Sequence, residues 1–251
     1  MKRLITEVTT VPVSAVGSGG AVAYQGTLPA ASPAPNSASS FAAVSAGSGS
    51  VLLFNGYATP AAANTRPLTS GGKPEILYVA TEYCPYCVAQ SWPLIIALSH
   101  FGQFSGLTLS RSPTFDGVAP VDGWTFYGSS YTSRYLAFAP VETYSNVLVS
   151  PKDNPADRTS YRRLQSLTAA QQAAFRRLDV GGQTPFTDFG GRFSETGSAI
   201  IPAALAGLTW SQIAADLRRP ASAAVLYSAS VLTAELCQLT GNRPATACPK
   251  S

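Results

Sequence analysis

The sequence predicts an α/β protein built on a central mixed sheet flanked by helices. Residues 76–80 form an apolar run with the length of a buried strand. Beyond it, apolar residues recur at helical spacing, at Val88, Trp92, Ile95 and Ile96. Two later stretches, 107–110 and 186–193, have the composition of further strands. This strand–helix–strand order favours a parallel pair within the sheet.

Between the first strand and the helix lies the motif Cys84-Pro85-Tyr86-Cys87. At a helix N-terminus the unpaired backbone N–H groups and the positive end of the helix dipole favour a thiolate. Pro85 falls in the first turn, where its missing N–H costs nothing. CxxC spacing puts the second sulfur one turn further along the helix. We therefore expect Cys84 to be a redox nucleophile and Cys87 the thiol that resolves its mixed disulfides.

The elements after this helix are expected in the following order. A strand over 107–110 should pair in parallel with 76–80. A change to Gly, aromatic and Thr residues predicts an inserted or extended hairpin from Asp116 to about Asn146, within a β-rich insertion at about 116–160. Helices should begin at Thr168 and at Thr209, because each is followed three positions later by a glutamine, as in a capping box.

A second hairpin and a last helix are predicted towards the C-terminus. Residues 186–189 alternate in polarity, Gly190 and Gly191 can supply the positive φ angles of a tight turn, and Arg192 begins the return strand. Pro185 is tolerated at the start of such a strand. The last helix, from about Ala221 to Leu239, opens a C-terminal helical extension over residues 221–248.

Residues 1–70 form a low-complexity N-terminal arm, and residues 71–251 form the folded domain. The arm is rich in Ala, Ser, Gly and Pro and holds too few large apolar groups to repay the ordering of its backbone. Residues 51–54 are the exception, and they are expected to add a strand to the sheet.

Composition narrows the function and the compartment. Only 12% of the residues are charged and the net charge is +4, which argues against nucleic-acid binding. No run of 18 apolar residues occurs, so we expect no membrane span in this chain. The first residues mimic a signal peptide, but Glu7 and Pro12 interrupt the apolar region, so no export signal is expected here. Four cysteines and low charge nevertheless suit an extracytoplasmic protein, either secreted or anchored to an outer membrane face.

A CxxC pair has three possible uses: a redox couple, half of a zinc site, or an inert disulfide. Zinc would need two more close ligands, but Cys237 and Cys248 lie far along the chain and His100 is the only histidine. No metal and no cofactor are therefore expected. A helix that starts at the first cysteine after a buried strand favours redox chemistry over a structural disulfide.

Two side chains near the motif bear on its chemistry. Tyr86 brings a phenol but no positive charge, so the dipeptide gives no sign of the extreme thiol acidity of strong oxidants. Glu82 is a candidate for proton transfer to Cys87, although an exposed carboxylate that merely solvates the surface is the alternative.

Cys237 and Cys248 are predicted to form a structural disulfide. They close a short loop that contains Gly241 and Pro244, and a bridge there would stabilise the fold by roughly 3 kcal/mol. Two free buried thiols are the alternative.

The motif Cys84–Cys87, followed later by Thr184-Pro185, resembles the thioredoxin superfamily. The resemblance implies a thioredoxin-like fold, with a cis-proline at the start of the strand that faces the CxxC motif. Pro185 matches that proline, and the implied substrate groove consists of Tyr83, Pro85, Tyr86, Thr184 and Pro185. One departure is Tyr78, which stands where thioredoxin has a buried acid.

A closer resemblance is to the family called domain of unknown function 929. It rests on five segments, 82–87, 131–133, 135–138, 185–190 and 237–241. The family is thioredoxin-like and often carries an N-terminal membrane anchor, so this resemblance bears on the fold more than on the substrate.

We therefore expect a thiol-disulfide oxidoreductase that acts on protein thiols or disulfides outside the cytoplasm, together with a redox partner that the sequence does not identify. Whether it oxidises, reduces or isomerises its substrates stays open. Two alternatives remain: a glutaredoxin-like reductase, suggested by the CPYC sequence itself, and a non-catalytic peptide-binding or chaperone module of the same fold.

Overall fold

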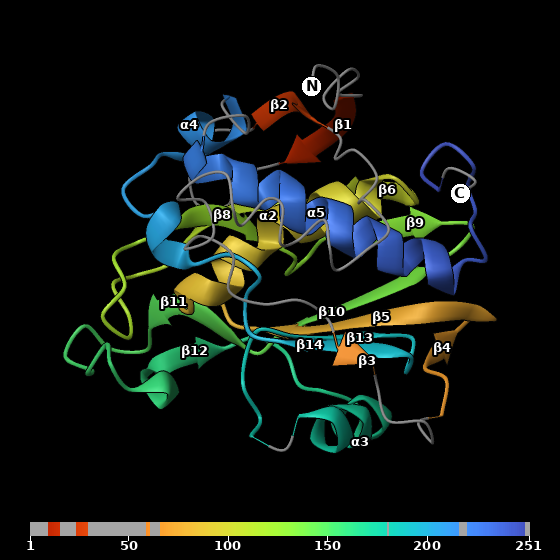
Figure 1. Ribbon diagram of the computed structural model, residues 1–251. Helices are drawn as coiled ribbons and strands as arrows, with labels where there is room; N and C mark the ends of the chain where they lie inside the picture. The colour runs from red at the N-terminus through yellow and green to blue at the C-terminus, as the bar shows by residue number, and fades with distance from the viewer. Residues whose placement is uncertain are drawn as a thin grey trace.

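The computed structural model describes residues 10–15, 24–29, 59–60, 66–179, 181–215 and 220–248. The strand expected over residues 51–54 lies outside them. The described chain is a mixed α/β structure in which one six-stranded sheet occupies the centre. Figure 1 shows the helices α2 and α5 on one side of this sheet and α3 on the other.

The central sheet mixes one parallel pairing with several antiparallel ones. Its strands, in spatial order, are β10 (Ala137–Glu142), β5 (Lys73–Ala80), β13 (Phe186–Phe189), β14 (Phe193–Thr196) and β3 (Thr59–Pro60). β10 runs parallel to β5, whereas β13 is antiparallel to β5 and β14 to β13. The short β4 (Thr69–Ser70) also pairs with β5.

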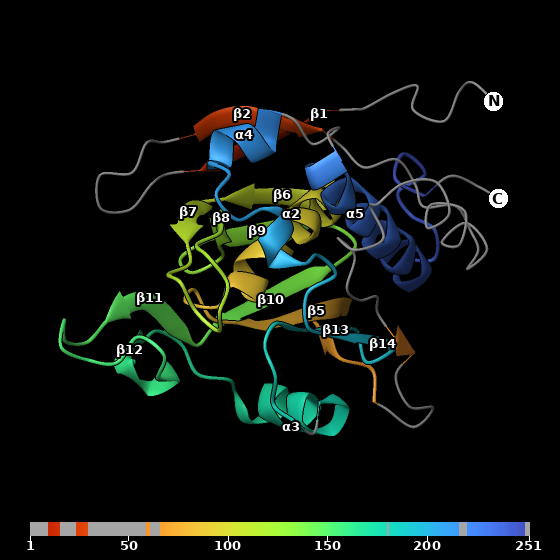
Figure 2. The ribbon, with the colours of Figure 1, turned by 60° about the vertical axis from the view of Figure 1, so that its left-hand side comes forward.

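Both faces of the sheet are covered, which explains why β5 is apolar and buried from Ile76 to Ala80. Ile76 and Tyr78 belong to a core that includes α2 (Pro85–Ser99) and α5 (Pro220–Leu239). Leu77 and Val79 alternate with them and pack in a second core with Phe175 of α3 (Ala169–Leu178). Figure 2 confirms the layering, with α3 below the sheet and α2 and α5 above it.

Two further sheets of two strands each pack around α2. β6 (Gly102–Ser105) pairs with β9 (Ser130–Ser133), and β7 (Thr108–Arg111) pairs with β8 (Asp122–Thr125). Trp92 of α2 lies against Trp124 of β8 and Trp210 of α4 (Trp210–Ala215), with ring centroids 5.9 and 5.3 Å away. These contacts bury α2 on the side that the central sheet leaves open.

The prediction that residues 107–110 pair in parallel with residues 76–80 was wrong. The strand at 107–110 corresponds to β7, which pairs antiparallel with β8 and not with β5. The predicted hairpin over 116–146 was wrong as well, because β8, β9 and β10 each pair with a strand outside that segment. The segment therefore supplies β10, the parallel edge strand of the central sheet.

Two further antiparallel strand pairs lie outside these sheets. β11 (Tyr144–Leu148) pairs with β12 (Tyr161–Arg163), and the 3₁₀ turn η2 (Arg158–Ser160) lies directly before β12. Within the predicted low-complexity arm, β1 (Thr10–Ala15) and β2 (Tyr24–Pro29) form an antiparallel pair, and β3 joins the central sheet. The described part of residues 1–70 thus contains more strand than its composition indicates.

Several local predictions are confirmed. Thr168 and Gln171 form a reciprocal capping box on α3, and Thr209 and Gln212 bond reciprocally at the start of α4. The glycines of the 186–193 turn adopt positive φ angles, 64° at Gly190 and 73° at Gly191. α5 follows the predicted C-terminal helix closely, and the turn η3 (Pro202–Ala204) precedes α4.

The C-terminal cysteines are paired as predicted. Cys237, near the end of α5, forms a disulfide with Cys248, and their Cα atoms are 5.6 Å apart. Both residues are buried. Across the described residues, no helix has the length and apolar character needed to cross a membrane.

Candidate active site

The first cysteine of the motif stands at the junction between β5 and α2. Cys84 is the N-cap of α2 and has an extended backbone, and Pro85 occupies the first helical position. The N–H of Cys84 donates to the carbonyl of Thr81 at 3.3 Å, which fixes the turn out of the strand. Cys84 and Cys87 carry free thiols. The predicted strand, motif and helix are therefore all present.

The surroundings of Cys84 favour its thiolate. A hydrogen bond from the Cys87 thiol lowers the pKa of Cys84, and it outweighs the opposing effect of burial. The backbone N–H groups of Cys87 and Tyr86, which point out of the helix N-terminus, lower that pKa further. The guanidinium of Arg158 adds a positive charge from a loop distant in sequence. No residue next to the motif in the sequence indicates this charge.

Cys87 has the opposite character. Its side chain is only 3% exposed, and burial raises its pKa well above the usual value. The hydrogen bond to Cys84 and the negative charges of Cys84 and Glu142 raise that pKa further. At neutral pH the pair therefore consists of an acidic thiol at the helix end and a protonated thiol behind it.

Glu142 is a buried acid near the motif that no sequence pattern indicated. This residue ends β10 and pairs in register with Ala80, at the end of β5. Its side chain is 3% exposed, and burial raises its pKa to about 8, with a smaller contribution from the charge of Glu82. One carboxyl oxygen accepts a hydrogen bond from the N–H of Phe126 at 3.3 Å. The other, Oε2, has no partner among the described residues.

Glu82, the carboxylate expected to transfer protons, lies nearer to the surface. It accepts a hydrogen bond from the N–H of Asn146 at 3.3 Å, and it contributes to the raised pKa of Glu142. Glu142, rather than Glu82, is among the groups that raise the pKa of Cys87. A direct role for Glu82 stays a prediction, but Glu142 is the acid with the stronger influence on the resolving thiol.

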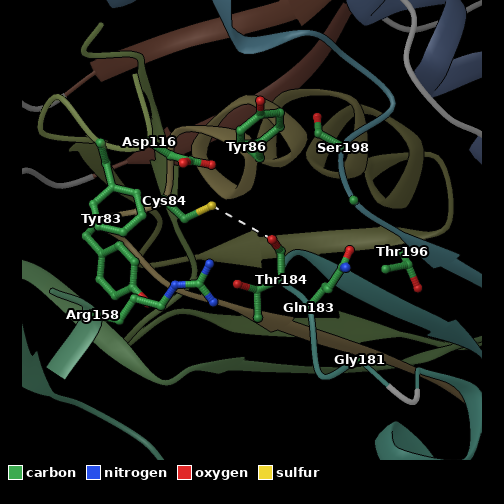
Figure 3. A pocket seen from close by; sticks show the side chains of 12 residues that line it. Tyr83, Cys84, Tyr86, Asp116, Arg158, Gly181, Gln183, Thr184, Thr196 and Ser198 are labelled. Atoms are coloured by element: carbon green, nitrogen blue, oxygen red, sulfur yellow. Dashed lines mark hydrogen bonds between the residues drawn. The ribbon is translucent and has the colours of Figure 1, made fainter. Parts of the chain in front are cut away.

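The loop before β13 faces the first cysteine. The Thr184–Pro185 peptide bond is cis, as the resemblance implied. The Cys84 thiol donates a weak hydrogen bond to the carbonyl of Thr184, 3.9 Å away, although the two residues are 100 positions apart (Figure 3). The predicted partners Cys84 and Thr184 are therefore brought together.

A pocket of about 550 Å³ opens at this junction. Of the predicted groove residues, Tyr83, Tyr86 and Thr184 line it together with Cys84, whereas Pro85 and Pro185 do not. The lining residues not predicted from the sequence are Phe115, Asp116, Arg158, Gly181, Gln183, Thr196, Gly197 and Ser198. They come from four separate segments of the chain, which include the end of β14 and the turn η2, and no local sequence signal connects them.

A buried polar line extends from the pocket into the core. Gln90, one turn after Cys87, accepts from the hydroxyl of Ser198 and from the N–H of Ala199, and it donates to Glu195 at 3.2 Å. Burial raises the pKa of Glu195 to about 8 and that of Glu235 on α5 to about 9. Among the described residues, no group of three or more His, Cys, Asp and Glu side chains could hold a metal ion.

One family model matches part of the chain. A model of the family described as Domain of unknown function (DUF929) matches residues 59–152, which include β5, the cysteine motif, α2 and Glu142. Neither the curated proteins nor the solved structures yield a match.

Proposed function

We propose that this protein has a thioredoxin-like fold and exchanges thiols and disulfides with polypeptide substrates outside the cytoplasm. The observation that carries the proposal is the asymmetry of the motif. Cys84 lines a pocket and its thiol has a lowered pKa, whereas Cys87 is buried behind it and its thiol has a raised pKa. The mixed sheet flanked by helices and the cis Thr184–Pro185 bond opposite Cys84 support the fold assignment. The buried disulfide between Cys237 and Cys248 supports an oxidising compartment.

The first step is attack by the Cys84 thiolate on one sulfur of a substrate disulfide. A bond forms between Cys84 and that sulfur, the substrate disulfide breaks, and the second substrate sulfur leaves as a thiolate. The N–H groups of Tyr86 and Cys87 stabilise the thiolate before the attack. The opposite wall of the pocket, at Thr184, offers backbone groups alongside which an extended substrate can lie.

The second step needs a base for Cys87. In the mixed disulfide, the Cys87 thiol gives its proton to the carboxylate of Glu142, and the resulting thiolate attacks the Cys84 sulfur. The substrate leaves as its second thiolate, and a Cys84–Cys87 disulfide remains, so two electrons have passed from the protein to the substrate. The same steps in reverse oxidise a substrate dithiol. Oε2 of Glu142 makes no hydrogen bond to Cys87 or to any other described residue, so we place a water between them to carry the proton.

Trapping on the resolving-cysteine variant tests this proposal. Cys87→Ala should accumulate stable mixed disulfides with an oxidised unfolded polypeptide, such as scrambled ribonuclease, because the second step is removed. Cys84→Ala, the matched control, should accumulate none through the motif, and the unchanged chain should catalyse insulin reduction by dithiothreitol. Trapping through Cys87 instead of Cys84, or insulin reduction that survives Cys84→Ala, would reject the mechanism. Binding of unfolded chains without exchange would favour the chaperone alternative.

A further inference from the structure

The pocket beside Cys84 contains two charged side chains, and neither has an ion-pair partner in the described part of the chain. Asp116 and Arg158 are the only Asp, Glu, Lys or Arg residues that line it. Within the described ranges a single ion pair forms, between Arg111 and Asp122, on β7 and β8. Arg158 and Asp116 therefore do not neutralise each other. Figure 3 shows the Cys84 sulfur between them, with the Asp116 carboxylate on one side and the Arg158 guanidinium on the other.

The loop that carries Arg158 is held in place by its own hydrogen bonds. The Asp157 carboxylate accepts from the N–H and the hydroxyl of Thr159, at 2.9 and 2.8 Å. The hydroxyl of Tyr161 donates to the carbonyl of Pro155 at 2.8 Å, and the Tyr161 ring stacks on Tyr83 with centroids 4.5 Å apart. Tyr83 directly precedes Cys84, so this stack links the Arg158 loop to the motif. A guanidinium whose loop is already ordered binds an anion at a lower entropic cost.

Asp116 is presented from the opposite side by a tight turn. Phe115 and Val118 exchange backbone hydrogen bonds at 3.1 and 2.9 Å, and Asp116 has a φ of 53° at the turn. Phe115 packs on Tyr83 with centroids 4.8 Å apart. Both charges are therefore carried on structures that contact Tyr83, and they flank the reactive sulfur from different directions.

From this arrangement we propose that Arg158 selects polypeptide substrates with an acidic side chain next to the reacting cysteine, on one flank only. The proposal rests on the thiol-disulfide exchange proposed above. A substrate sulfur must come within bonding distance of Cys84, so the residues beside it have to enter the pocket. A planar guanidinium binds a carboxylate through two parallel N–H···O bonds. Asp116 repels an acidic residue on the other flank of the substrate cysteine, so only the flank that faces Arg158 accepts an anion.

The experiment compares three peptides of equal length, each with one cysteine activated as a 2-pyridyl disulfide. One has Glu before the cysteine, one has Glu after it, and the third has Gln at both positions. The leaving thiopyridone is uncharged, and its release measures attack by Cys84 in the Cys87→Ala chain. We expect one Glu peptide to react about fivefold faster than the Gln peptide at low salt, and the ratio to shrink at high salt.

Arg158→Gln should bring that ratio close to one. Loss of this charge also makes Cys84 less acidic, but the same thiol attacks all three peptides, so the ratio cancels that effect. Arg162→Gln, on β12 outside the pocket, removes the same charge and should leave the ratio unchanged. Asp116→Asn should raise the rate of the slower Glu peptide.

Equal rates for the three peptides, or a preference that survives Arg158→Gln, would overturn this proposal while leaving the exchange reaction intact. No reaction with any peptide would instead reject the proposed function. The pyridyl disulfide of 3-mercaptopropionate carries a carboxylate but no peptide backbone, so its rate shows whether Arg158 recognises small acids instead of peptides. An Arg158-dependent gain for that compound but for neither Glu peptide would also overturn the proposal.

Discussion

The hydroxyl of Tyr78 lies 3.0 Å from the carbonyl oxygen of Cys87 and donates a hydrogen bond to it. This bond ties β5 to the first turn of α2, so Tyr78 holds the backbone of Cys87 in place. Its own pKa is raised by burial, and the phenol therefore stays protonated at neutral pH. The proton acceptor that we propose for Cys87 is Glu142, at the end of the neighbouring strand β10.

Replacing Glu142 with Gln should slow the second step of exchange more than the first. Gln keeps the acceptor for the N–H of Phe126 but cannot take a proton from Cys87. We expect Cys87 to resolve a preformed Cys84 mixed disulfide on the order of 100-fold more slowly, the lower end of the usual contribution of a general base. Single-turnover release of a fluorescent peptide measures this step.

The pH profile distinguishes a base from a packing residue. Glu142 has a pKa of about 8 and must be ionised to accept a proton, so resolution in the unchanged chain should accelerate from pH 6 to about pH 8. Glu142→Gln should lose that inflection. An unchanged profile in the variant would mean that Glu142 is not the proton acceptor.

Alkylation should separate the two cysteines of the motif. In the reduced protein at pH 7, iodoacetamide should modify Cys84 at least about tenfold faster than Cys87, because only the thiolate reacts and Cys84 has the lowered pKa. Mass spectrometry of peptides from a time course gives both rates. Equal rates, or faster labelling of Cys87, would contradict the assignment of nucleophile and resolving thiol.

The C-terminal disulfide should resist reduction when the motif does not. Cys237 and Cys248 are 8% and 2% exposed, so a reductant has poor access to either sulfur. During dithiothreitol titration of the oxidised protein, alkylation should first report Cys84 and Cys87, with the second pair protected. Reduction of both pairs together, or transfer of a disulfide to 237 and 248 during turnover, would make the second pair a redox relay.

Stability should fall as pH rises through the neutral range. Burial raises the pKa values of Glu142 and Glu195 to about 8 and of Glu235 to about 9, from an ordinary value of 4.5. Between pH 4.5 and these raised pKa values, the folded state binds more protons than the unfolded state. The contribution of each carboxyl group to stability is therefore complete below about pH 4.5 and is lost as the pH rises towards 9. The maximum slope is about 1.4 kcal/mol per pH unit for each proton.

Thermal unfolding between pH 5 and pH 9 measures this loss. Glu235→Gln should reduce the fall in melting temperature, because its amide does not ionise. Asp116→Asn, at an exposed carboxylate whose positive φ suits Asn, is the matched control and should leave the fall unchanged. A variant curve parallel to that of the unchanged chain would argue that Glu235 is already ionised in the fold.

Local features of the fold could be predicted from the sequence, and long-range pairings could not. The strand before Cys84, the helix after it and the capping boxes depend on residues a few positions apart. The residues at the start of β10 were expected to be part of a hairpin within 116–146, because no local pattern indicates that their partner is β5, far earlier in the chain.

The two cysteines of the candidate site and the Thr184 loop that faces them could be predicted from the sequence, but the rest of the pocket lining could not. Cys84, Cys87 and Thr184 were found because a motif or a resemblance marks them. Glu142 ends a strand and Arg158 stands in a polar loop, and at both places a charged residue is usually solvated. Folding buries Glu142 and brings Arg158 beside Cys84, and neither effect can be recognised from neighbouring residues.

All residues of α2 except Tyr86 and Ser99 are buried. The two small sheets and α5 lie along the flanks of this helix (Figure 2), and its N-terminal end opens into the pocket that contains Cys84. A disulfide fixed on the surface of a folded protein cannot enter this pocket and reach the Cys84 sulfur, whereas a disulfide in a flexible segment can. The protein should thus discriminate by the conformational freedom of its target. Its rates towards the native and urea-unfolded forms of one disulfide protein, compared with those of a small dithiol, would measure that discrimination.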